Sequence, residues 1–252
     1  MPGEHQGMTH EERMEIARSL HTMILDTHGE AILAVLVTSS TAKGLDLPYS
    51  DLELTAVTRD GSEIEGQSYY YRGLLIEIDY PEASKLLRSV RQVTALWPIV
   101  ADGYRDIIIL FERDGWTRQL RQALDERDAS DFSRGIRMSL TTMLEDRDKV
   151  RNAQAEGDGF GVIALAADVG YWAANVVLFL NRRPMITTRW FYRRAFECPD
   201  QPPAFRALVE LLRGVVHSSV DQVARTVEQL CDAVTAMARA RGITVESDTL
   251  LV

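Results

Sequence analysis

The sequence predicts an α+β protein with two domains, a first domain of strands and helices over residues 1–128 and an all-helical bundle over residues 129–252. Two observations predict this division. Short apolar runs of strand length alternate with helical spacings in the first half, and strand signals stop after about residue 130. Beyond that point, helices are expected over residues 132–152, 159–182, 203–216 and 219–241.

The first expected element is a helix that follows Thr9. Thr9 and Glu12 have the spacing of a capping box, and apolar residues then recur at helical intervals as far as Ile24. Gly29 suits the position just after the end of a helix, where a positive φ is common. We therefore expect this helix to end near His28.

Apolar runs and turn residues define the other elements of the first domain. Residues 39–50 are expected to form a loop, and residues 68–80 form one long strand or two short strands separated at Gly73. Pro81 is expected near the first turn of a helix. The predicted strands are 31–37, 52–57, 68–80 and 106–111, and the predicted helices are 81–90 and 116–127.

The composition is that of a globular protein with an acidic balance. Hydrophobic residues make up 46% and charged residues 26%, and the net charge is 28 − 37 = −9. This charge argues against a protein that binds nucleic acid by broad phosphate neutralisation, and it favours cationic partners. Cys198 and Cys231 lack metal-binding spacing and are expected to be reduced thiols. The first residues lack signal-peptide character, so a cytoplasmic location is expected.

The segment from Phe160 to Leu180 is apolar enough to be compared with a membrane span. It contains Asp168 and Asn175, and a central Asp would cost several kcal/mol in a bilayer. We therefore interpret this segment as a buried helix that packs on two sides, and we expect no membrane partner.

Acidic residues on two predicted strands carry the chemical signal of the sequence. Asp51 and Glu53 are two residues apart, so their side chains share one face of a strand. Glu77 lies between isoleucines in another strand, where a carboxylate needs a partner or a metal. If these strands are neighbours, the three carboxylates converge and a divalent cation such as Mg²⁺ relieves their repulsion. The alternative is that these acids form the solvated face of a half-exposed strand.

The residues from Ser39 to Glu53 resemble the G-S…D-x-E signature of the polymerase-β-like nucleotidyltransferase superfamily. Most of the chain is similar to the aminoglycoside 4′-O-nucleotidyltransferase (kanamycin nucleotidyltransferase) family, in which such segments occur in the same order. The matching segments are M-T-H-E-E-R-M from Met8, P-Y-S-D-L-E from Pro48, I-E-I-D-Y from Ile76, Trp97-Pro98, Glu145 with Lys149, Arg151-Asn152 and Thr187-Thr188.

This resemblance implies a mixed sheet with helices in the first domain and a helical bundle in the second. It implies Mg²⁺-dependent transfer of AMP from ATP, or of another nucleoside monophosphate, to the 4′-hydroxyl of an aminoglycoside, with release of pyrophosphate. It also implies a homodimer whose active sites lie between subunits. The implied metal ligands are Asp51, Glu53 and Glu77. The implied general base is Glu145, and Lys149 would bind the α-phosphate. The residues that would contact the triphosphate are Ser39, Ser40, Lys43, Ser50 and Thr188.

Several positions depart from the family pattern. Ser39 stands where the family has a glycine, and Lys43 stands where it has an arginine, which keeps the charge but loses the bidentate fork. Glu145 and Lys149 also have the spacing of an ordinary ion pair on a helix surface. An alternative function is therefore a non-catalytic or protein-modifying nucleotidyltransferase-fold module with a regulatory or antitoxin-like role.

Aromatic and acidic residues of the first domain fit a polycationic sugar. Eight acidic and two basic residues lie between Asp51 and Glu82, and Tyr69, Tyr70, Tyr71 and Trp97 can stack on sugar rings. The alternative for the tyrosines is packing within a strand, which we favour for at least two of the three.

Overall fold

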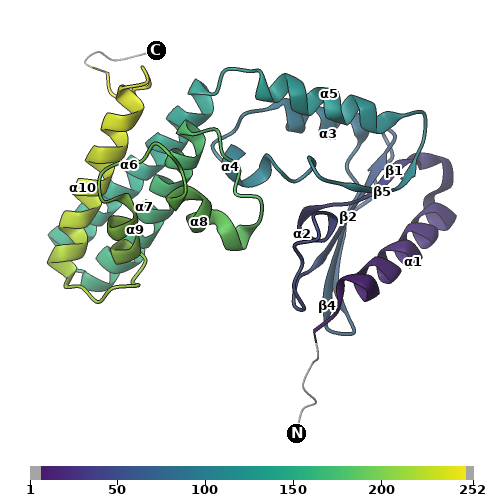
Figure 1. The fold of residues 1–252 in the computed structure, drawn as a ribbon, viewed down its shortest axis with the longest axis horizontal. Helices are drawn as coiled ribbons and strands as arrows, with labels where there is room; N and C mark the ends of the chain where they lie inside the picture. Colours follow the sequence, from purple (N-terminus) through teal and green to yellow (C-terminus); the bar gives the residue numbers. More distant parts are fainter. Residues whose placement is uncertain (1–6, 248–252) are drawn as a thin grey trace, which may run out of the picture. The chain divides into compact units, whose positions relative to one another are not determined.

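A computed structural model of the protein describes residues 7–247, and their contacts divide the chain into two compact units (Figure 1). The first unit contains the chain up to Gln92 together with Ala101–Ser130. The second unit contains Val93–Val100 and the chain from Asp131 onward. The chain thus enters the second unit for a short segment before it returns to finish the first, an excursion that the single boundary proposed at residue 128 does not describe.

The first unit is built on a five-stranded mixed sheet with the strand order β3-β4-β2-β1-β5. β2 and β4 are parallel neighbours, and the other pairs are antiparallel. The predicted strands are confirmed, and residues 68–80 form two strands that join at a turn where Arg72 and Gly73 both have positive φ. The strands are β1 Ile32–Val37, β2 Leu52–Thr58, β3 Gln67–Tyr71, β4 Leu74–Asp79 and β5 Ile108–Glu112.

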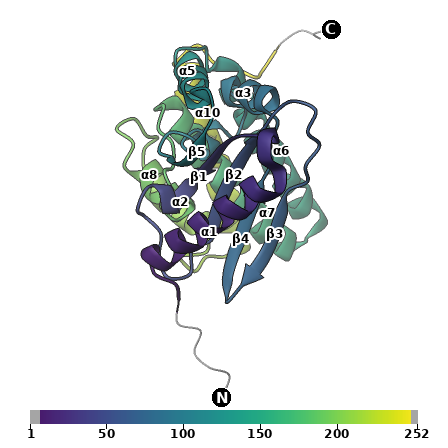
Figure 2. The ribbon, with the colours of Figure 1, turned by 90° about the vertical axis from the view of Figure 1, so that its right-hand side faces the viewer.

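Helices cover the two faces of this sheet. Helix α1, His10–His28, has the predicted capping box and crosses one face (Figure 2), where side chains such as Ile24, Leu54 and Ile76 form a buried core. A second core on the other face includes Val57 and Leu120 and involves α3, Ala83–Arg91, and α5, Trp116–Asp128. Successive side chains of β1 and β2 point to opposite faces of the sheet, so alternate residues of each strand enter one core or the other.

Two expectations for the first unit were wrong. The expected loop begins with a short helix, α2, Ser39–Ala42. Pro81 does not lie in the first turn of α3, because that helix begins at Ala83 after the N-cap residue Glu82. The Pro81 carbonyl instead accepts the N–H of Thr58 at 2.9 Å, so this residue prolongs the extended segment beside β2.

Among the described residues, the regular elements of the second unit are all helices, joined by turns and loops. The four predicted helices are confirmed, and three short elements, α4, α8 and the 3₁₀ turn η2, were not predicted. The elements are α4 Trp97–Val100, α6 Ser133–Glu156, α7 Gly159–Leu180, η2 Thr188–Trp190, α8 Phe191–Phe196, α9 Phe205–Leu212 and α10 Val220–Arg239.

Helix α7 is the central helix of this unit. It is the one helix among residues 7–247 that has the length and apolar composition of a membrane span, and 61% of its most apolar window is buried within the protein. Its Asn175 is fully buried and donates hydrogen bonds to Ser139 Oγ at 2.7 Å and to the Ala95 carbonyl at 2.8 Å. These contacts are those of a core helix that packs on several sides, as the sequence predicts.

Trp97 belongs to the core of the second unit. It is 4% exposed, and its ring centroid lies 4.7 Å from that of Phe132 and 5.4 Å from that of Phe179. The expectation that Trp97 stacks on a sugar ring is therefore wrong. Cys198 and Cys231 are free and buried, and burial raises the pKa of the Cys231 thiol to about 12.

Candidate functional site

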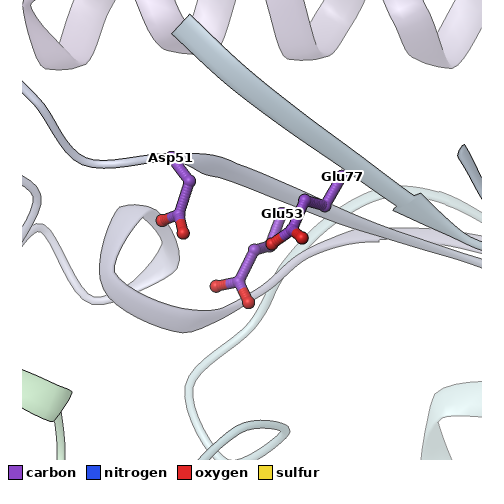
Figure 3. Close-up of side chains that lie close together, drawn as sticks. All are labelled: Asp51, Glu53 and Glu77. Carbon is purple, nitrogen blue, oxygen red and sulfur yellow. The ribbon is translucent and has the colours of Figure 1, made fainter. Parts of the chain in front are cut away.

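Three carboxylates converge on one face of the sheet in the first unit. The parallel register of β2 and β4 sets Glu53 directly beside Glu77, and Asp51 precedes β2 on the same face. One carboxylate oxygen from each of the three lies within 4.8 Å of the others (Figure 3). All three side chains are half-buried, because the opposite face of these strands packs against α1 while this face stays accessible.

The electrostatics of this cluster favour a bound cation. Burial raises the pKa of Glu53, the nearby Ser39 hydroxyl opposes that shift, and the charges of Asp51 and Glu77 add to the increase. Three like charges this close destabilise one another unless a positive charge lies between them. Carboxylate oxygens are the ligands that Mg²⁺ and similar hard cations prefer. The donor set therefore fits a divalent metal ion.

Helix α2 lies directly beside the three carboxylates. The Thr38 N–H donates to the Glu53 carbonyl at 3.1 Å, and the buried Thr41 hydroxyl donates to the Asp51 carbonyl at 3.4 Å. Ser39, between them, has φ = 56°. A side chain in this left-handed conformation costs roughly 1 kcal/mol, which glycine avoids. The backbone here thus keeps a conformation suited to glycine although the residue is serine.

Lys43 and Ser50 have partners within the first unit. The Lys43 ammonium lies 2.7 Å from Asp102, and both side chains are more than 90% buried. The Ser50 hydroxyl accepts the N–H of Leu47 at 2.9 Å. In this structure Lys43 ties α2 to the segment after Ala101, and Ser50 closes a turn just before Asp51.

A buried arginine holds the loop that leads to Asp51. Arg13 is fully buried, and its guanidinium donates to the Asp46 carboxylate. It also donates to two carbonyl oxygens, those of Leu47 and Ser50, and each of these two hydrogen bonds is 3.1 Å long. Asp46 also accepts a contact from His10 Nδ1 at 2.8 Å. The Arg13–Asp46 pair therefore fixes the backbone immediately before the first carboxylate of the cluster.

We predict that Arg13→Met lowers the free energy of unfolding by about 3 kcal/mol, because it leaves the Asp46 carboxylate buried without its cation. Urea denaturation followed by circular dichroism measures this loss. The matched control is Arg18→Met, which removes an exposed arginine from the same helix. Adding Asp46→Asn to Arg13→Met should recover part of the loss, and equal losses for Arg13→Met and Arg18→Met would contradict the assignment.

The other predicted site residues lie in the second unit. Glu145 and Lys149 are exposed on α6, one turn apart, and their charged atoms are 3.1 Å apart. Lys149 also contacts the Asp146 carboxylate at 2.9 Å. Hydrogen bonds to Asp146, which has the larger effect, and to Glu145 raise the pKa of Lys149. Thr188 is exposed in η2. The structure thus brings Asp51, Glu53 and Glu77 together in one unit and pairs Glu145 with Lys149 in the other.

Sequence reasoning missed the residues that hold these side chains in place. Arg13 lies on the same helical stripe as Ala17, Leu20 and Ile24, so a charged residue on an apolar face was the available signal. Asp102 carries no comparable local signal, because it meets Lys43 only through tertiary contacts. Asp146 lies three residues before Lys149 on the same helix, and that spacing was the signal by which it could have been found.

Comparison with known proteins gives a consistent set of relatives. Residues 114–244, just over half of the chain, match the family model described as the KNTase C-terminal domain. Two proteins named aminoglycoside nucleotidyltransferase (4′), from Staphylococcus aureus and from a Bacillus species, are each 22% identical over 240 residues, which is 95% of this chain and 95% of theirs. A solved nucleotidyltransferase-like protein from Exiguobacterium sibiricum has a similar fold, with a TM-score of 0.59, 14% identity, and coverage of 90% of this chain and 77% of that one.

Proposed function

The chain belongs to the KNTase C-terminal domain family, and on that basis we propose that it is a metal-dependent nucleotidyltransferase that transfers AMP from ATP to the 4′-hydroxyl of an aminoglycoside. The observation that carries this proposal is the convergence within 4.8 Å of Asp51, just before β2, with Glu53 and Glu77 on the neighbouring parallel strands β2 and β4. The similarity to two aminoglycoside nucleotidyltransferases over 95% of the chain supports the choice of acceptor. The reaction makes the protein an antibiotic-resistance enzyme of the cytoplasm.

In the proposed reaction the acceptor hydroxyl oxygen attacks the α-phosphorus of ATP in line with the leaving pyrophosphate. Glu145 accepts the proton of that hydroxyl, a new P–O bond forms, and the bond to pyrophosphate breaks. Lys149 donates hydrogen bonds to the α-phosphate and stabilises the charge that develops there. Asp146, which holds the Lys149 ammonium at 2.9 Å, keeps this cation in place on α6.

The proposed roles in the first unit are binding roles. Asp51, Glu53 and Glu77 hold a divalent cation, proposed to be Mg²⁺, which when bound neutralises triphosphate charge. Ser39, Ser40, Lys43, Ser50 and Thr188 are proposed to contact the triphosphate. For Lys43 this role requires the ammonium to leave Asp102, since that ion pair is buried. A homodimer with its active sites at the subunit interface completes the proposal.

Pyrophosphate release tests this function directly. Purified protein is incubated with ATP and Mg²⁺, with and without kanamycin or tobramycin, and pyrophosphate is measured by a coupled assay. Release that depends on the drug, together with a mass increase of the drug equal to one adenylyl group (AMP less one water), supports the proposal. Release that depends on an added protein in place of the drug, or no release with any acceptor, would favour the protein-modifying or the non-catalytic alternative.

We predict that the KM for kanamycin rises several-fold between about 0.05 M and about 0.5 M KCl, because the Debye length falls well below 10 Å over this range. The physical reason is that the ammonium groups of the drug meet carboxylates on an acidic face. The measurement is steady-state kinetics at saturating ATP and Mg²⁺, with kcat as the internal control. A KM that stays constant across this range would show that charge attraction does not drive drug binding.

A further inference from the structure

A cavity of about 310 Å³ adjoins the carboxylate cluster within the first unit. Three segments supply its walls: residues 7–8 before α1, the loop before β2 with Ser50 and Asp51, and the β3–β4 hairpin with Tyr70, Arg72 and Leu75. The cavity therefore shares a wall with the first of the proposed metal ligands. Its volume suits a single six-membered ring with its substituents.

Strand register places Tyr70 on the face of the sheet that carries the carboxylates. Tyr70 lies directly opposite Leu75 across the antiparallel β3–β4 pair, so the two side chains share a face. Leu75 is two residues before Glu77 on β4, and alternate residues of a strand point to the same face. Tyr70, Leu75, Glu77 and Glu53 thus belong to one continuous face.

The neighbouring tyrosines belong to the opposite face. Tyr69 pairs with Ile76 and Tyr71 pairs with Leu74, and both partners are buried in the core beneath α1. Tyr69 is 37% exposed and Tyr71 41% exposed, whereas Tyr70 is 75% exposed. The interpretation that at least two of the three tyrosines serve strand packing therefore fits Tyr69 and Tyr71, and Tyr70 presents its ring to solvent beside the cavity.

The position of the cavity relative to α2 indicates which substrate it receives. In the sheet β2 lies between β1, which leads into α2, and β4, which carries Leu75 and Glu77. If the triphosphate lies along α2 and its C-terminal end, where Ser39, Ser40 and Lys43 are proposed to contact it, an in-line reaction brings the acceptor from the opposite side of the α-phosphorus. That side is the β4 and β3 side, where the cavity lies. Ser50, which is also proposed to contact the triphosphate, lines the cavity and lies at the border between the two substrates.

The charge around the cavity fits a cationic ring. Asp51 lines the cavity, and Glu53 and Glu77 lie on the same face of the sheet. The cationic wall residue Arg72 has its guanidinium carbon 5.1 Å from the ring centroid of Tyr71, a stacking arrangement with the tyrosine of the opposite face. A sugar ring that bears ammonium groups can stack on the aromatic ring and pair with the carboxylates, since an aromatic face attracts cations.

We propose that Tyr70 is a specificity-determining residue that stacks on an aminosugar ring of the acceptor, held in the cavity between the β3–β4 hairpin and the loop before β2. The inference rests on the proposed function, because it assigns a place to the acceptor of that reaction. In this proposal the acceptor is held by an aromatic contact with Tyr70 as well as by the attraction between its ammonium groups and the carboxylates.

Steady-state kinetics of Tyr70→Ala, Tyr70→Phe and the control Tyr69→Ala test the proposal, with kanamycin and ATP varied in turn. Tyr70→Ala is expected to raise the KM for kanamycin about tenfold and to leave the KM for ATP within about twofold of wild type, as the loss of one ring-stacking contact implies. Tyr70→Phe and Tyr69→Ala should stay within about twofold of wild type for both substrates, since Phe keeps the ring and Tyr69 lies on the other face. Circular dichroism checks that each variant is folded.

Three results would overturn the assignment, and they are distinguishable. A rise in the KM for ATP without a rise in that for kanamycin places the nucleoside in the cavity. Unchanged constants for Tyr70→Ala, while the wild type turns over kanamycin, refute the role of Tyr70 and leave the proposed function standing. If the wild type itself releases no pyrophosphate with any aminoglycoside, the proposed function fails and the acceptor site fails with it.

Discussion

The Asp51→Asn substitution is expected to lower kcat by about 10⁴-fold, which corresponds to about 5.5 kcal/mol of lost transition-state stabilisation. Asp51 is a proposed metal ligand, and it is the one member of the three-carboxylate cluster that also lines the adjoining cavity. The amide that replaces it keeps the shape of the side chain but removes the charge that a hard cation requires. The measurement is pyrophosphate release at saturating ATP, kanamycin and Mg²⁺.

Stability measurements separate this effect from misfolding. Removing one of three mutually repelling charges should leave the metal-free melting temperature of Asp51→Asn equal to or above that of wild type. Mg²⁺ should raise the melting temperature of wild type and have a smaller effect on the variant. Glu65→Gln, which neutralises an exposed acid outside the cluster, is the matched control and should behave as wild type in both assays. Near-normal turnover by Asp51→Asn would refute the metal site.

Much of the fold follows from local sequence patterns. The strands and long helices were predictable because burial on one face imposes a period of two or of 3.6 residues over a sufficient length. Helices α2 and α4 have four residues each, too few to show a period, and they form because tertiary contacts fix them. One such contact is that of Thr41 in α2 with the Asp51 carbonyl.

The candidate site was only partly encoded in local patterns. The spacing of Asp51 and Glu53 places both on one face of β2, but the position of Glu77 beside Glu53 depends on β4 pairing in parallel with β2. The intervening β3 is paired on the far side of β4, and no local signal in the sequence specifies that order. The expectation that Glu77 lies beside Glu53 was supported by the resemblance to a family and not by the periodicity of the sequence. Partners such as Asp102, far from Lys43 in sequence, were out of reach for the same reason.

The second large effect is expected for Glu145→Gln, which should lower kcat by about 10³-fold while the KM values for ATP and kanamycin change little. A general base acts in the transition state, so its removal affects turnover more than ground-state binding. Glu145 is 62% exposed on α6, and its ion pair with Lys149 is a surface contact, so the substitution should leave the unfolding midpoint unchanged.

One further measurement distinguishes a base from a residue that merely positions Lys149. Proton transfer to Glu145 in the transition state should produce a solvent deuterium isotope effect on kcat, and Glu145→Gln should lose that effect while Lys149→Met keeps it. Glu156→Gln, at the end of the same helix, is the control for removal of a charge from α6. If Glu145→Gln retains both the wild-type rate and the isotope effect, the Glu145–Lys149 pair is an ordinary surface ion pair, and the hydroxyl proton must go to a different group.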